Sequence, residues 1–496
     1  MGELKELFLQ RRKKVEELRE EGIPLYPNTF RTSHSIGEIL SLIGSRSEEE
    51  LKALEERFSL AGRLMRLSNF GKAAFGHIQD RTGRIQGYFQ RDRMTEKSLQ
   101  VFRRLDIGDI IGVKGGLFRT RTGELTLIVE ELELLAKSLR PMPEKWHGLA
   151  DQEMRYRQRY VDLIVTPRTR GVFTTRSRAI AFLRNFLTSR GFLEVETPMM
   201  QPVPGGATAR PFKTHHNTLD MDLYLRVAPE LYLKRLLVGG FERVFEINRN
   251  FRNEGLSTQH NPEFTMLEFY QAYATYLELM EMTETMISSL AQEIKGEMAV
   301  EYQGTRLDFT PPWKRLTVRE SLLAYGELKE SELKEPEKVF RYGRHLGMEL
   351  KGDEPLGKIW VDLFEKIVEP HLVQPTFVTA YPIEDSPLAR KNDQNPEMVD
   401  RFELYIFGRE IANAFSELND PQDQRGRFQE QARTKGAGED GTGFVDEDFL
   451  RALEYGMPPA AGEGIGVDRL VMLFTDSPSI RDVILFPQMR PESQEK

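Results

Sequence analysis

The side chains best suited to chemistry lie in the segment FRNEGLSTQHNPEFTMLEFY, residues 251–270. Arg252 ends a strand-like stretch, a polar loop follows, and a second strand is expected to begin at residue 263. Alternation along that strand places one set of side chains on a common face, namely Phe264, Met266, Glu268 and Tyr270. Because an unpaired carboxylate is costly in a core, an arginine beside this face indicates a binding surface. A half-exposed strand with a salt-bridged Glu268 is the alternative.

A second segment, FELYIFGREIANAFSELND at residues 402–420, carries two glutamates on either side of an expected tight turn. The turn is expected near residues 407–408, and the glutamates are Glu403 and Glu410. Two carboxylates brought together are costly unless a cation lies between them, and Mg²⁺ prefers such oxygens. The pattern therefore favours a magnesium site.

Beyond that turn, alternation gives one strand face to Asn413, Phe415 and Glu417. Glu410 lies three residues before Asn413, so the two side chains reach the same cleft only if the strand is bulged. We therefore expect a β-bulge near residues 411–412.

A third segment, GEGIGVDRLVMLF at residues 462–474, contains three alternating glycines and an arginine. Gly462, Gly464 and Gly466 allow close approach to the backbone, and Arg469 enters on the helix that is expected to follow. A glycine-rich turn into a helix is a common anion-binding device, although many strand-to-helix turns share the pattern.

The first part of the chain predicts a small β-barrel. Strand-like stretches separated by turn residues occupy residues 58–66, 73–79, 84–89, 110–118 and 125–135. Five short strands within residues 58–137 are typical of an OB-fold. Such barrels bind single-stranded nucleic acid by stacking bases on aromatic side chains, and they also occur as plain structural modules. Residues 1–57 are expected to form a helical segment that begins with an amphipathic helix.

The rest of the chain predicts an α+β domain. A linker containing Pro141 and Pro143 is expected over residues 138–160, and the larger domain over residues 161–496. Its helices alternate with strands that follow one another through short loops, which favours an antiparallel sheet flanked by helices. The stretch around residues 275–375 is predicted to be a helical insertion.

Composition narrows the functional classes. The 496 residues contain no cysteine, which excludes disulfides, thiolate zinc sites and cysteine nucleophiles. No apolar stretch approaches the roughly 20 residues of a membrane helix, and the charged N-terminal segment lacks the apolar core of a signal peptide. We therefore expect a cytoplasmic protein with no membrane partner. Net charge is −8, but residues 1–145 carry 26 Lys and Arg against 22 Asp and Glu, as a modular nucleic-acid-binding enzyme could show.

Together, the three segments resemble motifs 2 and 3 of the class II aminoacyl-tRNA synthetases. The stretch FLEVETPMM at residues 192–200 resembles motif 1, with Pro198 at the position of the family's dimer interface. Further segments are similar to the bacterial-type lysyl-tRNA synthetases: YRQRYVDLI, GGATARPFKTHHNTLDMDLYLRVAPELYLKRL, NAFSELNDPQDQ and SIRDVILFPQMRP. The resemblance extends from about residue 58 to the end of the chain.

The resemblance implies an N-terminal OB-fold that binds the anticodon, a class II catalytic domain built on an antiparallel sheet, and a homodimer formed through the region of Pro198. It implies that lysine and ATP react to lysyl-adenylate and pyrophosphate, with Mg²⁺ as cofactor. The lysyl group is then transferred to the 3′ end of tRNA(Lys). The implied anticodon-binding positions are Phe75, Gln86 and Glu131.

The family's roles in the catalytic domain are carried over by motif position. Arg252 and Arg469 are the implied catalytic residues: Arg252 binds the ATP α-phosphate and the lysine carboxylate, and Arg469 meets the far phosphates. Phe264 stacks on adenine. The other ATP-binding positions are Glu254, His260, Asn261, Glu403 and Glu410, the last two being the implied Mg²⁺ ligands. The other lysine-binding positions are Gly206 and Glu230 at the α-amino group, Asn413 at the carboxylate, Glu268, Tyr270 and Glu417 around the side-chain ammonium, and Phe415 on the aliphatic stem.

Three other functions are compatible with parts of this pattern. An aspartate or asparagine synthetase shares the barrel and motifs, but two glutamates and a tyrosine in the pocket favour a cationic substrate. An enzyme that transfers lysine to a protein would resemble the catalytic domain alone. A non-catalytic relative would be expected to lose Arg252, Glu410 or Arg469. Three positions depart from the family's usual residues, namely Glu463, Ala414 and Ser68.

Overall fold

The computed structural model divides into two compact units, Met1–Gly148 and Leu149–Lys496. No helix in the described part of the chain is long and apolar enough to cross a membrane. The residues that the structure describes are 2–143, 151–207, 209–435 and 445–491.

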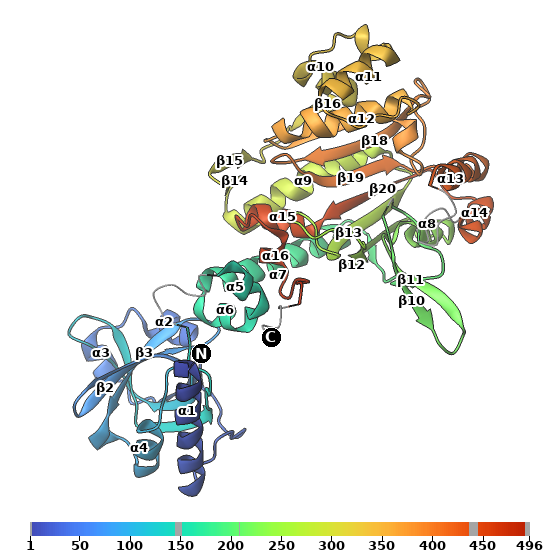
Figure 1. The fold of residues 1–496 in the computed structure, drawn as a ribbon. Coiled ribbons are helices and arrows are strands. Elements are labelled where there is room, and N and C mark those ends of the chain that lie inside the picture. The colour runs from blue at the N-terminus through green and yellow to red at the C-terminus, as the bar shows by residue number, and fades with distance from the viewer. Residues whose placement is uncertain (1, 144–150, 208, 436–444, 492–496) are drawn as a thin grey trace. The chain divides into compact units, whose positions relative to one another are not determined.

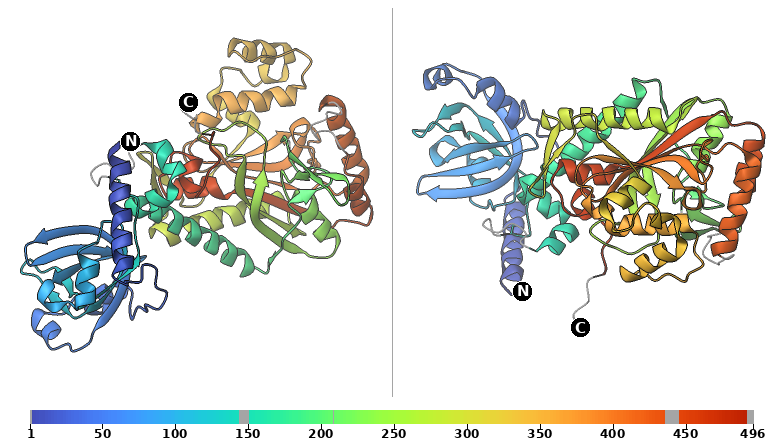
Figure 2. Two further views of the ribbon diagram at one scale, coloured as in Figure 1. Left: turned by 60° about the horizontal axis from the view of Figure 1, so that its bottom comes forward. Right: turned by 90° about the horizontal axis from the view of Figure 1, so that it is seen from above.

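The N-terminal unit is a rolled sheet of seven strands in the order β5-β6-β3-β2-β1-β4-β7, drawn in blue to teal in Figure 2. The strands are β1 (Phe58–Phe70), β2 (Ala73–Gln79), β3 (Arg84–Gln90), β4 (Ile110–Gly115), β5 (Leu117–Arg119), β6 (Leu125–Ile128) and β7 (Glu131–Ala136). The helices are α1 (Gly2–Glu20), α2 (Ile36–Ile43), α3 (Glu48–Lys52) and α4 (Glu96–Phe102). Ser35 and Ser47 start α2 and α3, and each forms a capping box with the glutamate three residues later.

The rolled sheet closes where β6 passes into β7. The Val129 N–H donates to the Tyr88 carbonyl of β3 at 2.9 Å, and the Glu130 N–H donates to the Lys114 carbonyl of β4 at 2.9 Å. One short stretch therefore bonds to both sides of the sheet, which gives the partly closed barrel of an OB-fold. Seven strands replace the five expected because Gly116 interrupts the fourth and residues 129–130 interrupt the fifth.

The centre of the second unit is an eight-stranded sheet in the order β16-β17-β18-β19-β20-β13-β12-β8, whose middle strands run side by side in Figure 1. Neighbouring strands are antiparallel except for the pairs β16–β17 and β12–β8 at the two edges. The strands are β8 (Leu193–Glu194), β12 (Arg243–Phe251), β13 (Glu263–Ala272), β16 (Lys314–Thr317), β17 (Thr376–Pro382), β18 (Met398–Tyr405), β19 (Glu410–Ser416) and β20 (Ala460–Gly466). A smaller sheet contains β9 (Met200–Gln201), β10 (Phe212–His216) and β11 (Met221–Leu225).

Helices flank this sheet. Leu183 of α7 and Met286 of α9 lie in one core with Leu267 and Phe269 of β13, so these two helices cover one face of the sheet. The helices are α5 (Gln152–Arg157), α6 (Arg159–Val165), α7 (Pro167–Thr188), α8 (Glu230–Val238), α9 (Tyr276–Lys295), α10 (Val318–Tyr325), α11 (Pro336–His345), α12 (Leu356–Ile367), α13 (Pro421–Lys435), α14 (Glu447–Glu454), α15 (Val467–Phe474) and α16 (Ile480–Val483). The predicted α+β class, with an OB-fold barrel and a largely antiparallel catalytic sheet, is confirmed.

Two stretches differ in detail from the sequence-based expectation. The region around residues 275–375 is not helical throughout, because it also contains β14 (Ala299–Tyr302), β15 (Thr305–Asp308) and the edge strand β16 of the main sheet. Within the predicted linker, residues 144–150 lie outside the described residues. Its end is already helical, because Asp151 caps the N-terminus of α5.

Candidate active site

Strand β13 presents the alternating face that the sequence predicts. Leu267 and Phe269 are fully buried in the core beneath the sheet. The alternate residues of β13, Phe264, Met266, Glu268 and Tyr270, line a cavity of about 560 Å³. Thr265 also reaches the cavity wall, but its hydroxyl accepts a hydrogen bond from Arg176 of α7. The predicted period of two is therefore confirmed, and the cavity lies on the face of the sheet opposite α7 and α9.

One part of the cavity is lined by two arginines and an aromatic ring. The guanidinium carbon of Arg252 lies 5.1 Å from the centre of the Phe264 ring. Its Nε is buried and has no hydrogen-bond partner among the described residues. Arg469 enters from α15, with its Nη1 3.5 Å from Glu410 Oε2. Two guanidinium groups beside an aromatic face suit a polyphosphate attached to a flat heterocycle.

The loop between β12 and β13 adds polar groups to the same part of the cavity, where Glu254, His260 and Asn261 all line the wall. Burial, with the charge of Arg469, lowers the pKa of His260, so that its ring is neutral at pH 7. Asn261 Nδ2 donates to the Glu263 carbonyl at 2.6 Å. Its Oδ1 is buried and has no partner within the described part of the chain. A buried oxygen of this kind is expected to be satisfied by a ligand or by water.

Strands β18 and β19 form the predicted hairpin. Phe407 and Gly408 both have positive φ, 53° and 63°, as a two-residue turn between antiparallel strands prefers. The register shifts between Leu404 and Tyr405, so that Ile411 is left as a bulge. The turn and the bulge expected from the sequence are both confirmed.

The bulge allows Glu410 and Asn413 to line the same cavity. The side chain of Glu410 is 42% exposed. Glu403 is not among the lining residues; its buried carboxylate accepts hydrogen bonds from Arg401, Tyr381 and Tyr405. The surrounding cavity walls limit the hydration of Glu410 although its side chain is accessible, and this, together with the Glu403 charge, raises its pKa. The two carboxylates are therefore close enough to repel each other, but only Glu410 opens to the cavity.

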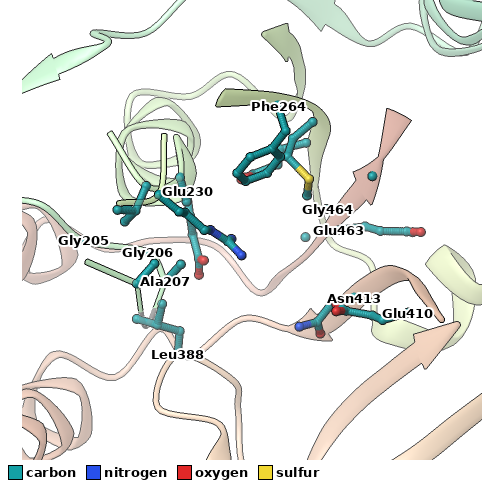
Figure 3. Close-up of a pocket in the computed structure, with 18 of the residues that line it drawn as sticks. Gly205, Gly206, Ala207, Glu230, Phe264, Leu388, Glu410, Asn413, Glu463 and Gly464 are labelled. Carbon is teal, nitrogen blue, oxygen red and sulfur yellow. The ribbon is translucent and has the colours of Figure 1, made fainter. Parts of the chain in front are cut away.

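Another part of the cavity is acidic. Figure 3 shows Gly206 and Glu230 close together on its wall. Gly206 has a φ of +90°, and a Cβ there would lie 3.0 Å from the Cβ of Glu230, so the position requires glycine. Tyr270 Oη donates to Glu268 Oε2 at 3.3 Å. Burial, with the charge of Glu230, raises the pKa of Glu268 to about 8. Such a carboxyl group is poised to receive a cation.

Glu417 lies behind this wall and not directly on it. It is 1% exposed, and its Oε2 forms an ion pair of 2.5 Å with Lys234 Nζ. Lys234 also pairs with Glu230 Oε1 at 2.7 Å. Phe415 lines the cavity, and its ring centre is 5.3 Å from the Lys234 ammonium. Glu417 is therefore already paired with a cation of the chain itself, which the sequence analysis did not anticipate.

Comparison with known proteins agrees with this geometry. Residues 151–490 match the family described as tRNA synthetases class II (D, K and N), and residues 58–135 match the OB-fold nucleic acid binding domain. Over 488 residues the chain is 57% identical to a Lysine--tRNA ligase of Thioalkalivibrio sulfidiphilus, which covers 98% of both chains. It is 56% identical to that of Pelotomaculum thermopropionicum, over 99% of this chain and 96% of the relative. It is 54% identical to that of Moorella thermoacetica, over 99% of each.

This chain belongs to the lysine–tRNA ligases. The resemblance that the sequence motifs suggested is thereby confirmed. The family match spans the barrel as well as the catalytic unit, whereas an enzyme that transfers lysine to proteins was expected to resemble the catalytic unit alone.

The glycines of the third segment lie on strand β20 and not in a turn. Strand β20 runs to Gly466, and α15 follows directly at Val467. A Cβ on Gly462 would lie 2.5 Å from Tyr270 Cδ1, and Tyr270 Cε1 and Glu417 Oε1 would be closer still. The absence of a side chain at Gly462 therefore makes room for pocket residues, which differs from the anion-binding turn expected from the sequence.

Two buried cations of the site were missed by the sequence analysis. Arg401 lines the cavity and donates from Nε to Asn413 Oδ1 at 3.1 Å, which orients that amide. Its position two residues before Glu403 on one strand was an available signal, because side chains two apart share a face. Lys234 lies four residues after Glu230, a spacing that places both on one face of a helix. That spacing is common on solvent-exposed helices and does not reveal burial.

The three barrel positions are placed on two parts of the N-terminal unit. Phe75 on β2 packs against Tyr88 and Phe70, with ring centres 4.9 Å and 6.1 Å away. Gln86 is on the adjacent strand β3, and Glu131 is on β7. Phe75 and Gln86 therefore share a neighbourhood, and the aromatic cluster beside them offers a stacking surface.

The three departures from the family pattern have different surroundings. Both carboxylate oxygens of Glu463 lie 2.6 Å from Thr283 Oγ1 of α9, and burial raises the pKa of Glu463 well above its usual value. Ala414 is fully buried in the sheet core. Ser68 is on β1 opposite Phe75. Only Ser68 lies beside a predicted RNA-binding position.

Proposed function

We propose that this chain activates L-lysine with ATP to form lysyl-adenylate and pyrophosphate, and then transfers the lysyl group to the 3′ end of tRNA(Lys). The observation that carries the proposal is the arrangement of one cavity, in which Arg252 and Arg469 adjoin a group of buried carboxylates. A phosphate-binding part next to a cation-binding part is what the condensation of a nucleotide with a diamino acid requires.

The first step needs placement and charge stabilisation. An oxygen of the lysine carboxylate attacks the α-phosphorus, and pyrophosphate leaves with the bonding electron pair. Because the attacking carboxylate is already ionised, no side-chain base is needed. Arg252 is suited to stabilise charge on the phosphoryl oxygens, since its guanidinium is forked and held against the Phe264 ring. In the second step a ribose hydroxyl at the tRNA terminus attacks the lysyl carbonyl, and AMP leaves.

Selectivity for lysine is attributed to the acidic part of the cavity. Glu268 and Tyr270 lie on its wall, and the unpartnered Oε1 of Glu417 lies just behind Gly462. A substrate without a side-chain ammonium would leave these groups unpaired in a buried place. Discrimination against neutral amino acids of similar size is therefore expected to reach roughly 10⁴-fold. Gly206 and Glu230 are suited to the α-amino group, and Asn413 to the carboxylate.

We further propose that ATP binds together with Mg²⁺ at Glu410. Mg²⁺ is usually bound by one or two carboxylates together with phosphate oxygens. The donor set fits, because Glu410 opens to the cavity and a cation would relieve its repulsion with Glu403. Glu403, whose oxygens are held by three protein donors, would contribute mainly through its charge. The ion would neutralise charge on the phosphates.

The barrel is proposed to bind the anticodon through Phe75 and Gln86, with Glu131 as a third contact. Base stacking on an aromatic side chain is worth roughly 1–3 kcal/mol. Phe75→Ala is therefore expected to raise the KM for tRNA roughly 5- to 150-fold and to leave tRNA-independent ATP–pyrophosphate exchange unchanged. Loss of exchange activity together with tRNA charging would contradict a role confined to tRNA binding.

A homodimer formed through the region of Pro198 is also proposed. Leu193 and Met200 flank Pro198 and are 47% and 56% exposed in the single chain. Large apolar side chains at such exposure are suited to an interface. Sedimentation should give twice the mass of the chain. Because tRNA charging is a cytoplasmic reaction, we propose that the protein acts in the cytoplasm.

The decisive experiment is amino-acid-dependent ATP–pyrophosphate exchange with each of the twenty amino acids. Exchange is expected with lysine. With each of the other amino acids the exchange rate is expected to be lower by orders of magnitude. Strong exchange with aspartate or asparagine, or with no amino acid, would refute the proposal. Charging of total tRNA with labelled lysine then tests the second step.

A further inference from the structure

A buried ammonium group lies within the wall of the acidic pocket, and the proposed reaction leaves it without a role. Lys234 has a fully buried side chain, and its Nζ lies 2.7 Å from Glu230 Oε1 and 2.5 Å from Glu417 Oε2. Glu230 starts helix α8, whereas Glu417 directly follows strand β19. Lys234 therefore connects two of the three elements that supply carboxylates to the pocket.

The two carboxylate oxygens of Glu417 have different surroundings. Neither oxygen has a hydrogen bond of good geometry among the described residues, but Oε2 forms the ion pair with Lys234, whereas Oε1 has no ion pair there. That Oε1 lies beside Gly462 and Tyr270, both of which line the cavity. A buried carboxylate oxygen that lies behind the cavity wall without a partner is expected to be satisfied by a hydrogen-bond donor that enters the cavity.

The charges around the pocket can be counted. Glu230, Glu268 and Glu417 carry three negative charges when ionised, and Lys234 reduces the sum to two. Lysine brings two ammonium groups, while its carboxylate is assigned to Arg252. With Lys234 in place, the two remaining negative charges of the pocket balance the two positive charges of lysine. Without it one buried carboxylate would be left uncompensated, and such a group takes up a proton.

We propose that Lys234 is a positioning residue for the amino acid: its ammonium fixes Glu230 and Glu417 in orientation and matches the charge of the pocket to a substrate with two ammonium groups. The inference rests on the proposed function. The competing explanation is that Lys234 forms an ion pair that only stabilises the fold.

Protonation in the pocket is consistent with this role. Burial opposes the charge of Lys234, but Glu230 and Glu417 outweigh it and raise its pKa. Burial raises the pKa of Glu417, and Lys234 counteracts that rise. The groups that face this pair are Glu230 on α8 itself and Glu268 and Tyr270 on β13. Removing Lys234 should therefore make Glu417 harder to ionise.

The test is lysine-dependent ATP–pyrophosphate exchange, measured between about pH 6.5 and pH 9, with Lys234→Met, Glu417→Gln and the double variant. Lys234→Met is expected to raise the KM for lysine roughly 30- to 300-fold, while the KM for ATP stays within about threefold. The pH at which the lysine KM reaches its minimum should shift upward. In the double variant the effect of Lys234→Met should disappear, because Glu417 no longer carries a charge to be held.

Lys137→Met is the matched control. Lys137 is an equally buried lysine in the N-terminal unit, paired with Asp106 and Asp109 at 2.6 and 2.7 Å. The Lys137→Met variant should have a lower free energy of unfolding, with no change in the KM for lysine or in the pH dependence of that KM.

Equal rises in both KM values, an unshifted pH profile or additive effects in the double variant would overturn the proposal and leave a structural ion pair. If Lys234→Met does not fold, Lys234→Gln is measured with the same expectations. If the wild type shows no lysine-dependent exchange, the proposed function fails as well. A normal wild type with unchanged Lys234 variants refutes only the role of Lys234.

Discussion

Substitution of Gly462 by alanine should damage the lysine pocket without harming the ATP part of the cavity. An added Cβ would lie 2.5 Å from Tyr270 Cδ1, and it would be closer still to Tyr270 Cε1 and to Glu417 Oε1. Ordinary contacts of this kind are 3.4–4 Å. The tyrosine ring and the carboxylate must therefore move by about 1 Å, and because both are buried at the wall of the lysine pocket, that movement changes the shape of the pocket.

The size of the effect follows from that displacement. A misplacement of about 1 Å in a reacting complex can cost on the order of 100-fold, which is about 2.7 kcal/mol. We therefore expect kcat/KM for lysine to fall about 100-fold in ATP–pyrophosphate exchange, while the KM for ATP stays within about threefold. Overpacking should lower the free energy of unfolding by about 1–3 kcal/mol, which a protein of this size tolerates.

Gly464→Ala is the matched control, because Gly464 lies two residues along the same strand and faces the same cavity. Its added Cβ would be 3.1 Å from Met266 Cε, the end of a flexible side chain, and 3.6 Å from Glu268 Cγ. A loss of less than about fivefold is expected. Equal losses in the two variants, or a Gly462→Ala protein within threefold of the wild type for lysine, would refute the reasoning.

The remaining predictions concern charge. Arg252→Ala should lower kcat for exchange by roughly 10²–10³-fold, measured at saturating lysine and ATP. The reason is that the negative charge on the α-phosphate oxygens would lose the guanidinium that stabilises it. Burial raises the pKa of Glu268 to about 8, and only its ionised form binds an ammonium group. The kcat/KM for lysine should therefore rise with pH by up to about tenfold per pH unit below pH 8. Glu268→Gln should weaken that pH dependence. Burial holds the pKa of Glu463 well above its usual value, so its contribution to stability is present at low pH and is lost as pH rises. Relative to Glu463→Gln, the wild type should lose about 1.4 kcal/mol per pH unit between the ordinary glutamate pKa and the raised one, as measured by urea unfolding.

The parts of the site that the sequence predicted well are those governed by one strand or one turn. Alternation along β13 was correct because the two faces of a sheet are covered by different material, and each side chain must belong to one of them. The bulge at Ile411 was predicted from a chemical requirement, that Glu410 and Asn413 face the same cleft, and the register confirms it. Likewise the strands of the barrel follow from turn residues.

What the sequence could not predict depends on partners brought together from distant segments. Glu403 and Glu410 look equivalent around a tight turn, yet Tyr381 of β17 and Arg401 engage Glu403 while Glu410 opens to the cavity. No local pattern contains Tyr381, because it precedes Glu403 by 22 residues and lies on a different strand. The metal-binding hypothesis therefore now rests more on Glu410 than on the symmetrical pair.

The lysine pocket shows why the count of acidic residues in a motif is not the charge that a substrate meets. From the sequence, Glu268 and Glu417 form a pair of equal carboxylates for one ammonium group. In the folded chain Glu417 already shares Lys234 with Glu230, whereas Glu268 accepts a hydrogen bond from the hydroxyl of Tyr270. Glu268 has no ion pair among the described residues, and burial, with the charge of Glu230, raises its pKa. On the proposed role of Lys234, selectivity for a diamino acid comes from the balance between three carboxylates and one internal ammonium, which exists only once α8, β13 and the end of β19 are packed together.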